Sequence, residues 1–474
     1  MYSRDITFDT IPGSIRKPGK HIEFNLKLAV RTLPGNLQRL VLIGQRLAVG
    51  PVAAAVPVNV FSDAESSTYF GRGSVLGSMV KAALTANPYV QLTCVALDDE
   101  PTATAASCTI TITGTATTAG SLGVLISNER VNAGIYVGDD AATVAASIKA
   151  VIDADPDLPV AATVAAGVVT LTAKNKGELG NQIKVSTVQL LAAGVSAATT
   201  AMAGGSLDPD IQNALTPLFA GGHDILASSL NDSANLTKLR DYLDTVSGPL
   251  EQRGAIATYA LTSTLASATT LASTINSGRI TNALLPATVS LPWEVSAAYA
   301  AVIAFEEDPA RPLNTLPLTG IAPPPLANRL GRTEQENCLY NGVTPLEVGP
   351  GEKVQIVRSI TTYTKDPQGV ADPSLLDITT IRSLDYTRKA ILQRWALRFP
   401  RDKKTLRTKA RVWSETYDVL LKLEELEIVE NVVANKDKLI VQDDLQDPSR
   451  LNVRIPTDIV NGLHILAGVV DLYL

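Results

Sequence analysis

The sequence is poor in the residues that build disulfide frameworks, metal sites and catalytic centres. Among its 474 residues there are only three cysteines and three histidines. Cys94, Cys108 and Cys338 are odd in number and form no C-x-x-C pair, which argues against a disulfide framework or a zinc site and favours a reducing compartment. We therefore expect neither a metal nor any other cofactor.

Long hydrophobic runs and a strong net charge are also missing. The longest mainly apolar stretch, VSAAYAAVIAF at 295–305, is far shorter than the roughly 18 residues of a membrane-spanning helix. Charged residues between Asp5 and Lys17 interrupt the apolar core that a signal peptide needs. The formal net charge of −6 is mild and indicates no nucleic-acid or membrane partner. A composition that is 45% hydrophobic and 19% charged suits a chain that hides surface in an assembly.

Catalytic motifs are likewise scarce. His223, in GGHDILASS, is the one candidate for a hydrolase base, because His21 and His464 lie in the terminal extensions. No G-x-S-x-G elbow accompanies it. The stretch GSIRKPGKH departs from a phosphate-binding loop, since five residues instead of four separate Gly13 from Gly19 and His21 replaces the Ser/Thr. We therefore do not expect this protein to be an enzyme. Two alternatives stay open: an α/β hydrolase-like enzyme, and a surface-layer or adhesin protein.

What is present is an α/β rhythm in two separated stretches, 26–99 and 206–360. Short β-branched runs such as RLVLIG and AIATYAL alternate with helical patterns such as GSVLGSMVKAALTAN and ANLTKLRDYLDTV. This alternation predicts a mostly parallel sheet that is covered by helices on both faces. The two stretches therefore form one discontinuous α/β core.

The intervening stretch, 100–205, has a different composition. It is rich in Ala, Thr, Gly and Val, and period-two segments such as SCTITITGTATT predict strands. One helix is expected in AATVAASIKAVIDAD, with Val144, Ile148, Val151 and Ile152 along one stripe and Asp139 and Asp140 at its positive end. We interpret the stretch as a β-rich insertion that faces outward.

The third region, 361–474, predicts an α+β domain with two long helices, followed by short strands. Eleven Arg/Lys lie between Arg382 and Arg411 against two acids, a net of +9, and the stretch from Glu415 to Asp447 has ten acids against three lysines, a net of −7. This uneven charge has two interpretations. The basic and acidic helix faces partly neutralise each other, or the basic segment forms a surface directed at an acidic partner.

Both ends of the chain are apolar and extended in character, although termini are usually polar. Residues 1–25 form the expected N-terminal arm, and IVNGLHILAGVVDLYL forms a C-terminal strand arm. Such ends either fold back or pair with neighbouring chains. The arm residues expected at the contacts between subunits are Ile6, Phe8, Ile11, Ile15, Ile22, Phe24, Ile465, Val469, Val470, Leu472 and Tyr473.

These features together resemble the tail sheath proteins of contractile-tailed bacteriophages, of the phage Mu type. The resemblance rests on RKPGKHIEFN followed by RLVLIG, on TYFGRGSVLGSMVKAA before a strand that ends in LDD, and on DLPVAATVAAGVVTLTAKNKGELGNQIKV within the insertion. It continues with GGSLDPDIQNAL, LDYTRKAI and DPSRLNVRIPTDIV. Their order and spacing extend over nearly the whole chain.

The resemblance implies a structural subunit that polymerises as stacked, helically arranged rings around a tail tube and contracts to drive the tube through the host envelope. It implies a core of subtilisin-like topology without protease activity, and terminal arms that add strands to neighbouring subunits. The implied partners are other copies, the tail tube, the baseplate and the tail terminator, with assembly in the host cytoplasm into a virion tail. Part of the C-terminal domain would face the tube, and we expect Arg401, Lys403, Lys404 and Arg407 there.

Overall fold

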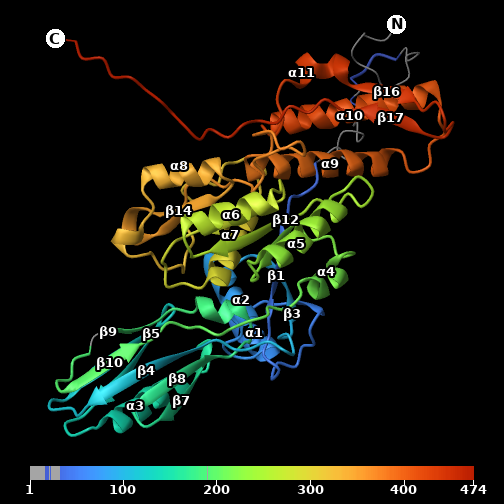
Figure 1. The fold of residues 1–474 in the computed structure, drawn as a ribbon. Coiled ribbons are helices and arrows are strands. Elements are labelled where there is room, and N and C mark those ends of the chain that lie inside the picture. Colours follow the sequence, from blue (N-terminus) through green and yellow to red (C-terminus); the bar gives the residue numbers. More distant parts are fainter. Residues whose placement is uncertain (1–16, 21, 23–32, 189, 474) are drawn as a thin grey trace. The chain divides into compact units, whose positions relative to one another are not determined.

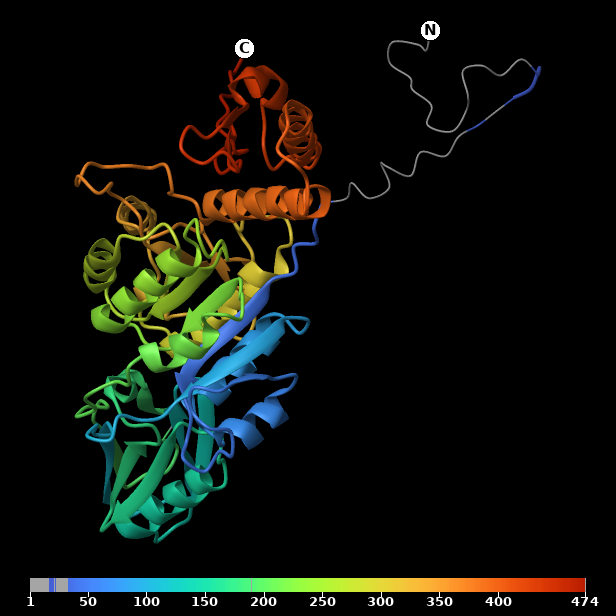
Figure 2. The ribbon, with the colours of Figure 1, turned by 90° about the vertical axis from the view of Figure 1, so that its right-hand side faces the viewer.

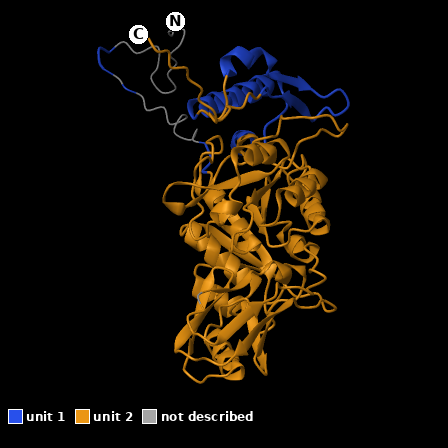
Figure 3. Cartoon of the chain, turned by 60° about the vertical axis from the view of Figure 1, so that its left-hand side comes forward, with its two compact units in different colours: residues 1–35, 387–426, 431–456 blue, residues 36–386, 427–430, 457–474 orange. Residues whose placement is uncertain are grey.

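A computed structural model describes residues 17–20, 22, 33–188 and 190–473. The chain divides into two compact units (Figure 3). Unit 1 comprises residues 1–35, 387–426 and 431–456, and unit 2 comprises residues 36–386, 427–430 and 457–474. Among the described residues no helix combines the length and hydropathy needed to cross a membrane.

The core of unit 2 is an eight-stranded sheet with the order β15-β14-β13-β12-β11-β1-β3-β2. The six inner strands run parallel, and only the outer pairs β2–β3 and β14–β15 are antiparallel. The mostly parallel sheet is thereby confirmed. Its strands are β1 (Arg39–Gln45), β2 (Pro57–Asn59), β3 (Gln91–Leu97), β11 (Ile225–Ser228), β12 (Ile256–Leu261), β13 (Ile280–Leu284), β14 (Thr344–Val348) and β15 (Val354–Ile356).

Helices cover both faces of this sheet (Figures 1 and 2). Helices α2 and α7 pack on each other against β1, β11 and β12, and α4, α5 and α6 form a second group. Side-chain caps begin several of them, since Ser74, Asp232 and Thr264 each accept a backbone N–H from the first turn. The helices are α1 (Asp63–Phe70), α2 (Val75–Ala86), α4 (Gln212–Leu218), α5 (Ser233–Val246), α6 (Leu265–Ile275), α7 (Pro292–Phe305) and α8 (Arg332–Tyr340), with short 3₁₀ turns η2 (Leu326–Asn328) and η3 (Pro350–Glu352).

The insertion extends from the end of the core that holds α1 and α2 (Figure 1). It contains two antiparallel sheets, β10-β4-β8-β7 and β6-β5-β9. Strand interiors such as Ile110, Val124 and Leu171 are fully buried, so the insertion has an apolar core of its own. Its elements are β4 (Ser107–Gly114), β5 (Gly120–Ile126), β6 (Glu129–Ile135), α3 (Ala141–Asp153), β7 (Val160–Ala165), β8 (Val168–Ala173), η1 (Glu178–Gln182), β9 (Val185–Val188) and β10 (Val195–Thr199).

The predicted insertion helix is confirmed as α3. Asp140 caps it by accepting the Thr143 N–H, and Val144, Ile148 and Ile152 are buried. The sequence pattern predicted strands in SCTITITGTATT, GVVTLTAKNKG and NQIKVSTVQL, whereas the described part of the insertion contains seven strands. The additional strands consist mainly of small and polar residues. They form strands because they pack against their sheet partners, and the local sequence pattern does not show this packing.

Helix α9 (Ile378–Arg398) begins in unit 2 and ends in unit 1. Within unit 1 it is followed by α10 (Leu406–Glu425), α11 (Val432–Asn435), the 3₁₀ turn η4 (Lys436–Lys438) and the strands β16 (Ile440–Asp443) and β17 (Leu451–Arg454). The two strands form an antiparallel hairpin against α10. Among the described residues this hairpin has no third strand, so each strand keeps one unpaired edge.

Candidate functional site

The C-terminal segment carries the largest group of exposed apolar side chains in the described chain. Its predicted strand forms no ladder with its own chain in the described region, and Figure 1 draws it as a plain trace. In the described chain a row of backbone and apolar groups is therefore left without an internal partner. The exposed side chains are Leu463, Ile465, Leu466, Val469, Val470, Leu472 and Tyr473, with exposed fractions of 74–97%.

The N-terminal arm can be followed only in part. Ile22 is 86% exposed. The other apolar residues expected at the contacts, Ile6, Phe8, Ile11, Ile15 and Phe24, lie outside the described residues. The exposure of Ile22 is in keeping with a side chain that is covered only by another molecule.

The basic segment is divided between buried ion pairs and exposed cations. Arg394, whose side chain is only 3% exposed, pairs with Glu415 at 3.0 Å and Asp418 at 2.6 Å. Beside this cluster the Trp395 indole N–H donates to Thr416 Oγ1 at 2.9 Å. The contacts join α9 to α10 inside unit 1, so part of the positive charge holds the helix pair together.

The four residues expected to face the tube lie in the link between α9 and α10 and at the start of α10. Lys404 is half-buried, because it pairs with Asp443 at 3.3 Å and donates to the Pro448 carbonyl at 2.7 Å. Arg401, Lys403 and Arg407 are exposed. Within the described chain their side chains have neither an ion pair nor a hydrogen bond, which leaves these three cations available to a partner.

His223 lies in the loop before β11 and is half-buried. Burial lowers the pKa of its imidazole, and the neighbouring Arg39 lowers it further against the opposing effect of Asp224. Its Nδ1 is buried and has no hydrogen-bond partner among the described residues. A neutral ring between a turn and the Arg39–Asp224 pair is typical of a packed loop histidine.

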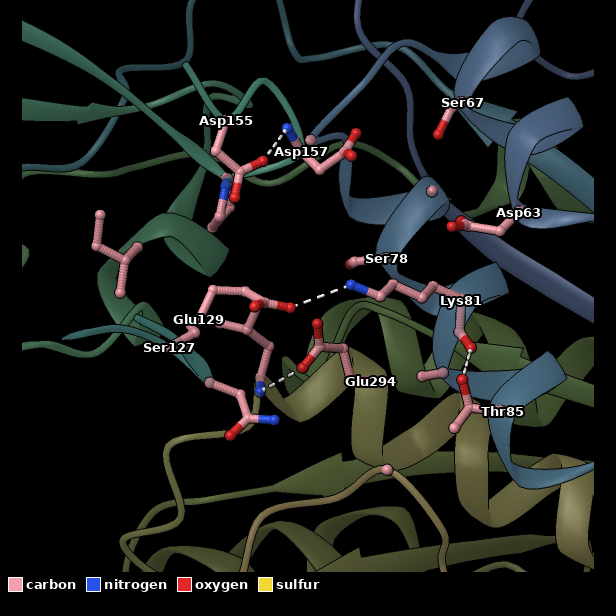
Figure 4. Close-up of a pocket in the computed structure, with 18 of the residues that line it drawn as sticks. Asp63, Ser67, Ser78, Lys81, Thr85, Ser127, Glu129, Asp155, Asp157 and Glu294 are labelled. Carbon is pink, nitrogen blue, oxygen red and sulfur yellow. Dashed lines mark hydrogen bonds and ion pairs between the residues drawn. The ribbon is translucent and has the colours of Figure 1, made fainter. Parts of the chain in front are cut away.

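A pocket of about 320 Å³ lies between the insertion and α1, α2 and α7 (Figure 4). Most of its carboxylates already have partners: Glu129 pairs with Lys81 at 3.1 Å, and Glu294 accepts the Leu291 N–H at 3.0 Å. Asp157 is paired with Arg72 in bidentate geometry. Burial raises the pKa of Glu294 to about 7. Within the described chain no three metal-ligating side chains converge as a metal site would require. The pocket is a polar seam between two parts of unit 2.

A loop of the insertion, 174–182, holds it on the core through polar contacts that the sequence reading missed. The Asn175 amide donates to the Arg46 carbonyl at 2.9 Å and to Asp99 Oδ1 at 3.0 Å, and its oxygen accepts the Val75 N–H at 3.1 Å. Asp99 also accepts the Lys176 N–H and a Gln45 amide proton. We call this cluster the joint. Two sequence features could have pointed to these contacts: the LDD at the end of β3 and the turn KNKG. They lie far apart in the chain, and no local pattern shows that they meet.

Asp208 forms the second half of the joint. Its Oδ1 accepts the N–H groups of Glu178 at 2.6 Å and Leu179 at 3.2 Å. Gly177 approaches so closely that a Cβ there would lie 2.4 Å from this oxygen. Burial raises the pKa of Asp208 to about 6, although both hydrogen bonds lower it. The Asp208 carboxylate therefore holds η1 in place, although its burial removes water from the charged group and destabilises the ionised form.

Family models of three phage tail sheath domains match consecutive parts of the chain. The β-sandwich domain matches residues 101–208, the central domain 204–362 and the C-terminal domain 370–472. The Mu-like prophage FluMu tail sheath protein of Haemophilus influenzae Rd is 34% identical over 489 aligned residues, which cover 99% of this chain and 100% of that protein. The chain belongs to the phage tail sheath protein family.

Solved structures share the fold of this sheath protein. The sheath tail protein of Desulfitobacterium hafniense is 12% identical, with a TM-score of 0.53 over 94% of this chain and 97% of that one. A chain of the anti-feeding prophage baseplate is 10% identical, with a TM-score of 0.50 over 97% of this chain and 100% of that one. The family is structural, and the function of the chain is that of a sheath subunit in a contractile phage tail.

Proposed function

We propose that this sheath subunit polymerises as stacked helical rings around a tail tube and that its termini make the contacts between copies. The observation that carries the proposal is the row of exposed apolar residues from Leu463 to Tyr473. A soluble monomer gains nothing from such a row, whereas a strand lent to a neighbouring copy buries it.

The proposed acceptor is the β16–β17 hairpin of another copy. A two-stranded sheet is marginal by itself and gains stability from a third strand. Each backbone hydrogen bond adds roughly 0.5–1.5 kcal/mol net, so an arm strand with about six bonds contributes several kcal/mol per contact. Because the donor and acceptor surfaces differ, the interface is heterologous, and with a rise per subunit it produces an open helical assembly.

Contraction would then move the subunits as rigid bodies while their arm strands stay paired, and drive the tube through the host envelope. We place Arg401, Lys403 and Arg407 toward the tube and the insertion, 100–205, toward the outside. Lys404 contributes less than expected to the tube-facing charge, because Asp443 already neutralises it. The baseplate and the tail terminator are the remaining proposed partners, and assembly takes place in the host cytoplasm.

We further propose that the core has a subtilisin-like topology and acts without catalysis. The loop environment of His223 supports the absence of catalysis, because its Nδ1 has no hydrogen-bond partner among the described residues, so no carboxylate orients the ring as a hydrolase base requires. The pocket carboxylates already serve as structural acceptors. Incubation with a fluorophosphonate probe tests the alternative of a hydrolase. Stoichiometric labelling of one serine would contradict a purely structural role.

Polymerisation is tested by Val470→Asp, with Leu250→Asp as the matched control. Both side chains are almost fully exposed, at 97% and 93%, so neither change should alter the thermal unfolding of the soluble subunit. We expect negative-stain microscopy to show long helical tubes for the wild type and for Leu250→Asp, and short or no tubes for Val470→Asp. Full-length tubes from Val470→Asp would exclude the C-terminal arm from the contact.

A further inference from the structure

The C-terminal extension of unit 2 has two parts that differ in their contacts with the rest of the unit. Residues 457–464 run along their own unit: Glu430 N–H donates to the Asp458 carbonyl at 2.9 Å, and Val460 N–H donates to the Ile428 carbonyl at 3.2 Å. We call this part the root. From Ile465 to Tyr473 the large apolar side chains are 78–97% exposed. His464 is the last half-buried residue of the extension, although Leu463 just before it is already 74% exposed.

His464 is the last residue of the extension that is inserted into the core. Its side chain is only 12% exposed, and its Nδ1 lies 3.0 Å from Asn314 Nδ2 and 3.3 Å from Asn314 Oδ1, the amide nitrogen being the closer of the two. With Nδ1 accepting from that amide, the proton of the neutral ring is on Nε2. Nε2 lies 3.5 Å from Asp377 Oδ1, so the N–H faces a carboxylate, although it has no hydrogen-bond partner among the described residues.

The site that receives the histidine is held together by an ion pair of its own. Asp377 is held by Arg358 in a bidentate pair with both distances at 2.8 Å. Asp377 lies directly before α9, and Arg358 follows β15, so the pair is fixed at two elements of the core. Burial lowers the pKa of His464, Arg358 lowers it further, and Asp377 opposes both. The neutral ring therefore docks without adding a buried charge.

The backbone of the root is fitted to the same place. A Cβ at Gly462 would lie 2.6 Å from Pro312 Cγ and 2.9 Å from His464 Nε2. Only a glycine lets the chain pass this closely under the ring. We call the site that receives His464 the socket; it is formed by the Pro312–Asn314 loop, Arg358 and Asp377. Gly462 and His464 of the root fit into it.

We propose that His464 is a positioning residue that clasps the root to its own core and so sets the origin and the reach of the arm lent to a second copy. This inference rests on the proposed function. Clasped, the arm from Ile465 to Tyr473 can extend about 30 Å at roughly 3.3 Å per residue. If the root is released from the core, residues 457–464 become part of the flexible arm, and the length of the tether roughly doubles. The effective concentration of a tethered strand falls with about the −3/2 power of the tether length, which gives about a threefold loss.

The clasp is tested first on the soluble full-length chain by hydrogen exchange. In His464→Ala we expect the Val460 amide to exchange about fivefold faster, which is the effect of losing one net hydrogen bond. His464→Asn should restore part of the protection, because its Oδ1 can accept from Asn314 where Nδ1 did. His223→Ala, a second half-buried histidine outside the socket, is the matched control and should leave Val460 unchanged. Unchanged exchange in His464→Ala would overturn the clasp.

Assembly provides the second readout. His464→Ala should raise the lowest concentration that gives tubes by about threefold, with His464→Asn in between and His223→Ala like the wild type. Faster exchange with an unchanged assembly threshold would show that the clasp exists but does not position the arm, which overturns the proposal. A wild-type chain that forms no tubes would contradict the proposed polymerisation, and the exchange experiment would still decide the clasp.

Discussion

Asn175→Ala should destabilise unit 2 by separating the insertion from the core at the joint. The Asn175 side chain is 7% exposed and makes three hydrogen bonds of 2.9–3.1 Å to groups on three different core segments. Truncation removes all three. At about 1 kcal/mol net for each bond the loss is about 3 kcal/mol, and it grows if the Val75 N–H remains buried without a partner.

Asn341→Ala is the matched control for this change. Asn341 also donates its amide to two acceptors, Asn337 O at 2.8 Å and Asn337 Oδ1 at 2.7 Å, but it is exposed at the end of α8. Water can replace these bonds, so the effect should stay within about 0.5 kcal/mol. The midpoint of urea unfolding, followed on the soluble subunit, compares the two variants.

Limited proteolysis gives a second measure of the joint. We expect Asn175→Ala to be cut faster between the insertion and the core, because local opening there no longer breaks these hydrogen bonds. If Asn175→Ala and Asn341→Ala unfold at the same urea concentration and are cut at the same rate, the joint does not hold the insertion and the argument from its hydrogen bonds is wrong.

Two further predictions concern charge. Lys403→Glu with Arg407→Glu should weaken loading onto purified tail tubes, more at low salt than at high salt, because each surface pair is worth only ~0–1 kcal/mol and is screened. Lys184→Glu, an exposed lysine in the insertion, should have no effect, and normal loading of the double variant at low salt would remove these cations from the tube interface. Burial raises the pKa of Asp208 from 3.8 to about 6, so the folded state binds a proton more tightly than the unfolded state, and stability falls as the pH rises from 4 to 6 by up to about 3 kcal/mol. Asp208→Asn keeps an acceptor for η1 and should flatten that fall in urea titrations; an unchanged slope would place the effect elsewhere.

The amino-acid pattern determined the features that depend on neighbours along the chain. Alternating runs such as RLVLIG and GSVLGSMVKAA were sufficient to predict β1, α2 and the parallel sheet, because strand and helix each impress their own period on the burial of consecutive residues. The C-terminal apolar run was recognised in the same way. That this run serves as an arm stays a prediction, which rests on the family resemblance and on the exposure of its apolar side chains.

Tertiary structure decided everything that depends on which distant groups meet. Asp99, Asn175 and Asp208 read as ordinary polar turn residues, and only the folded chain brings them together as the joint. The net charge of a segment was readable, but the division between buried Arg394 and exposed Lys403 was not. Periodicity is a local property of the chain, whereas the pairing of a polar group depends on what the fold brings within about 3 Å of it.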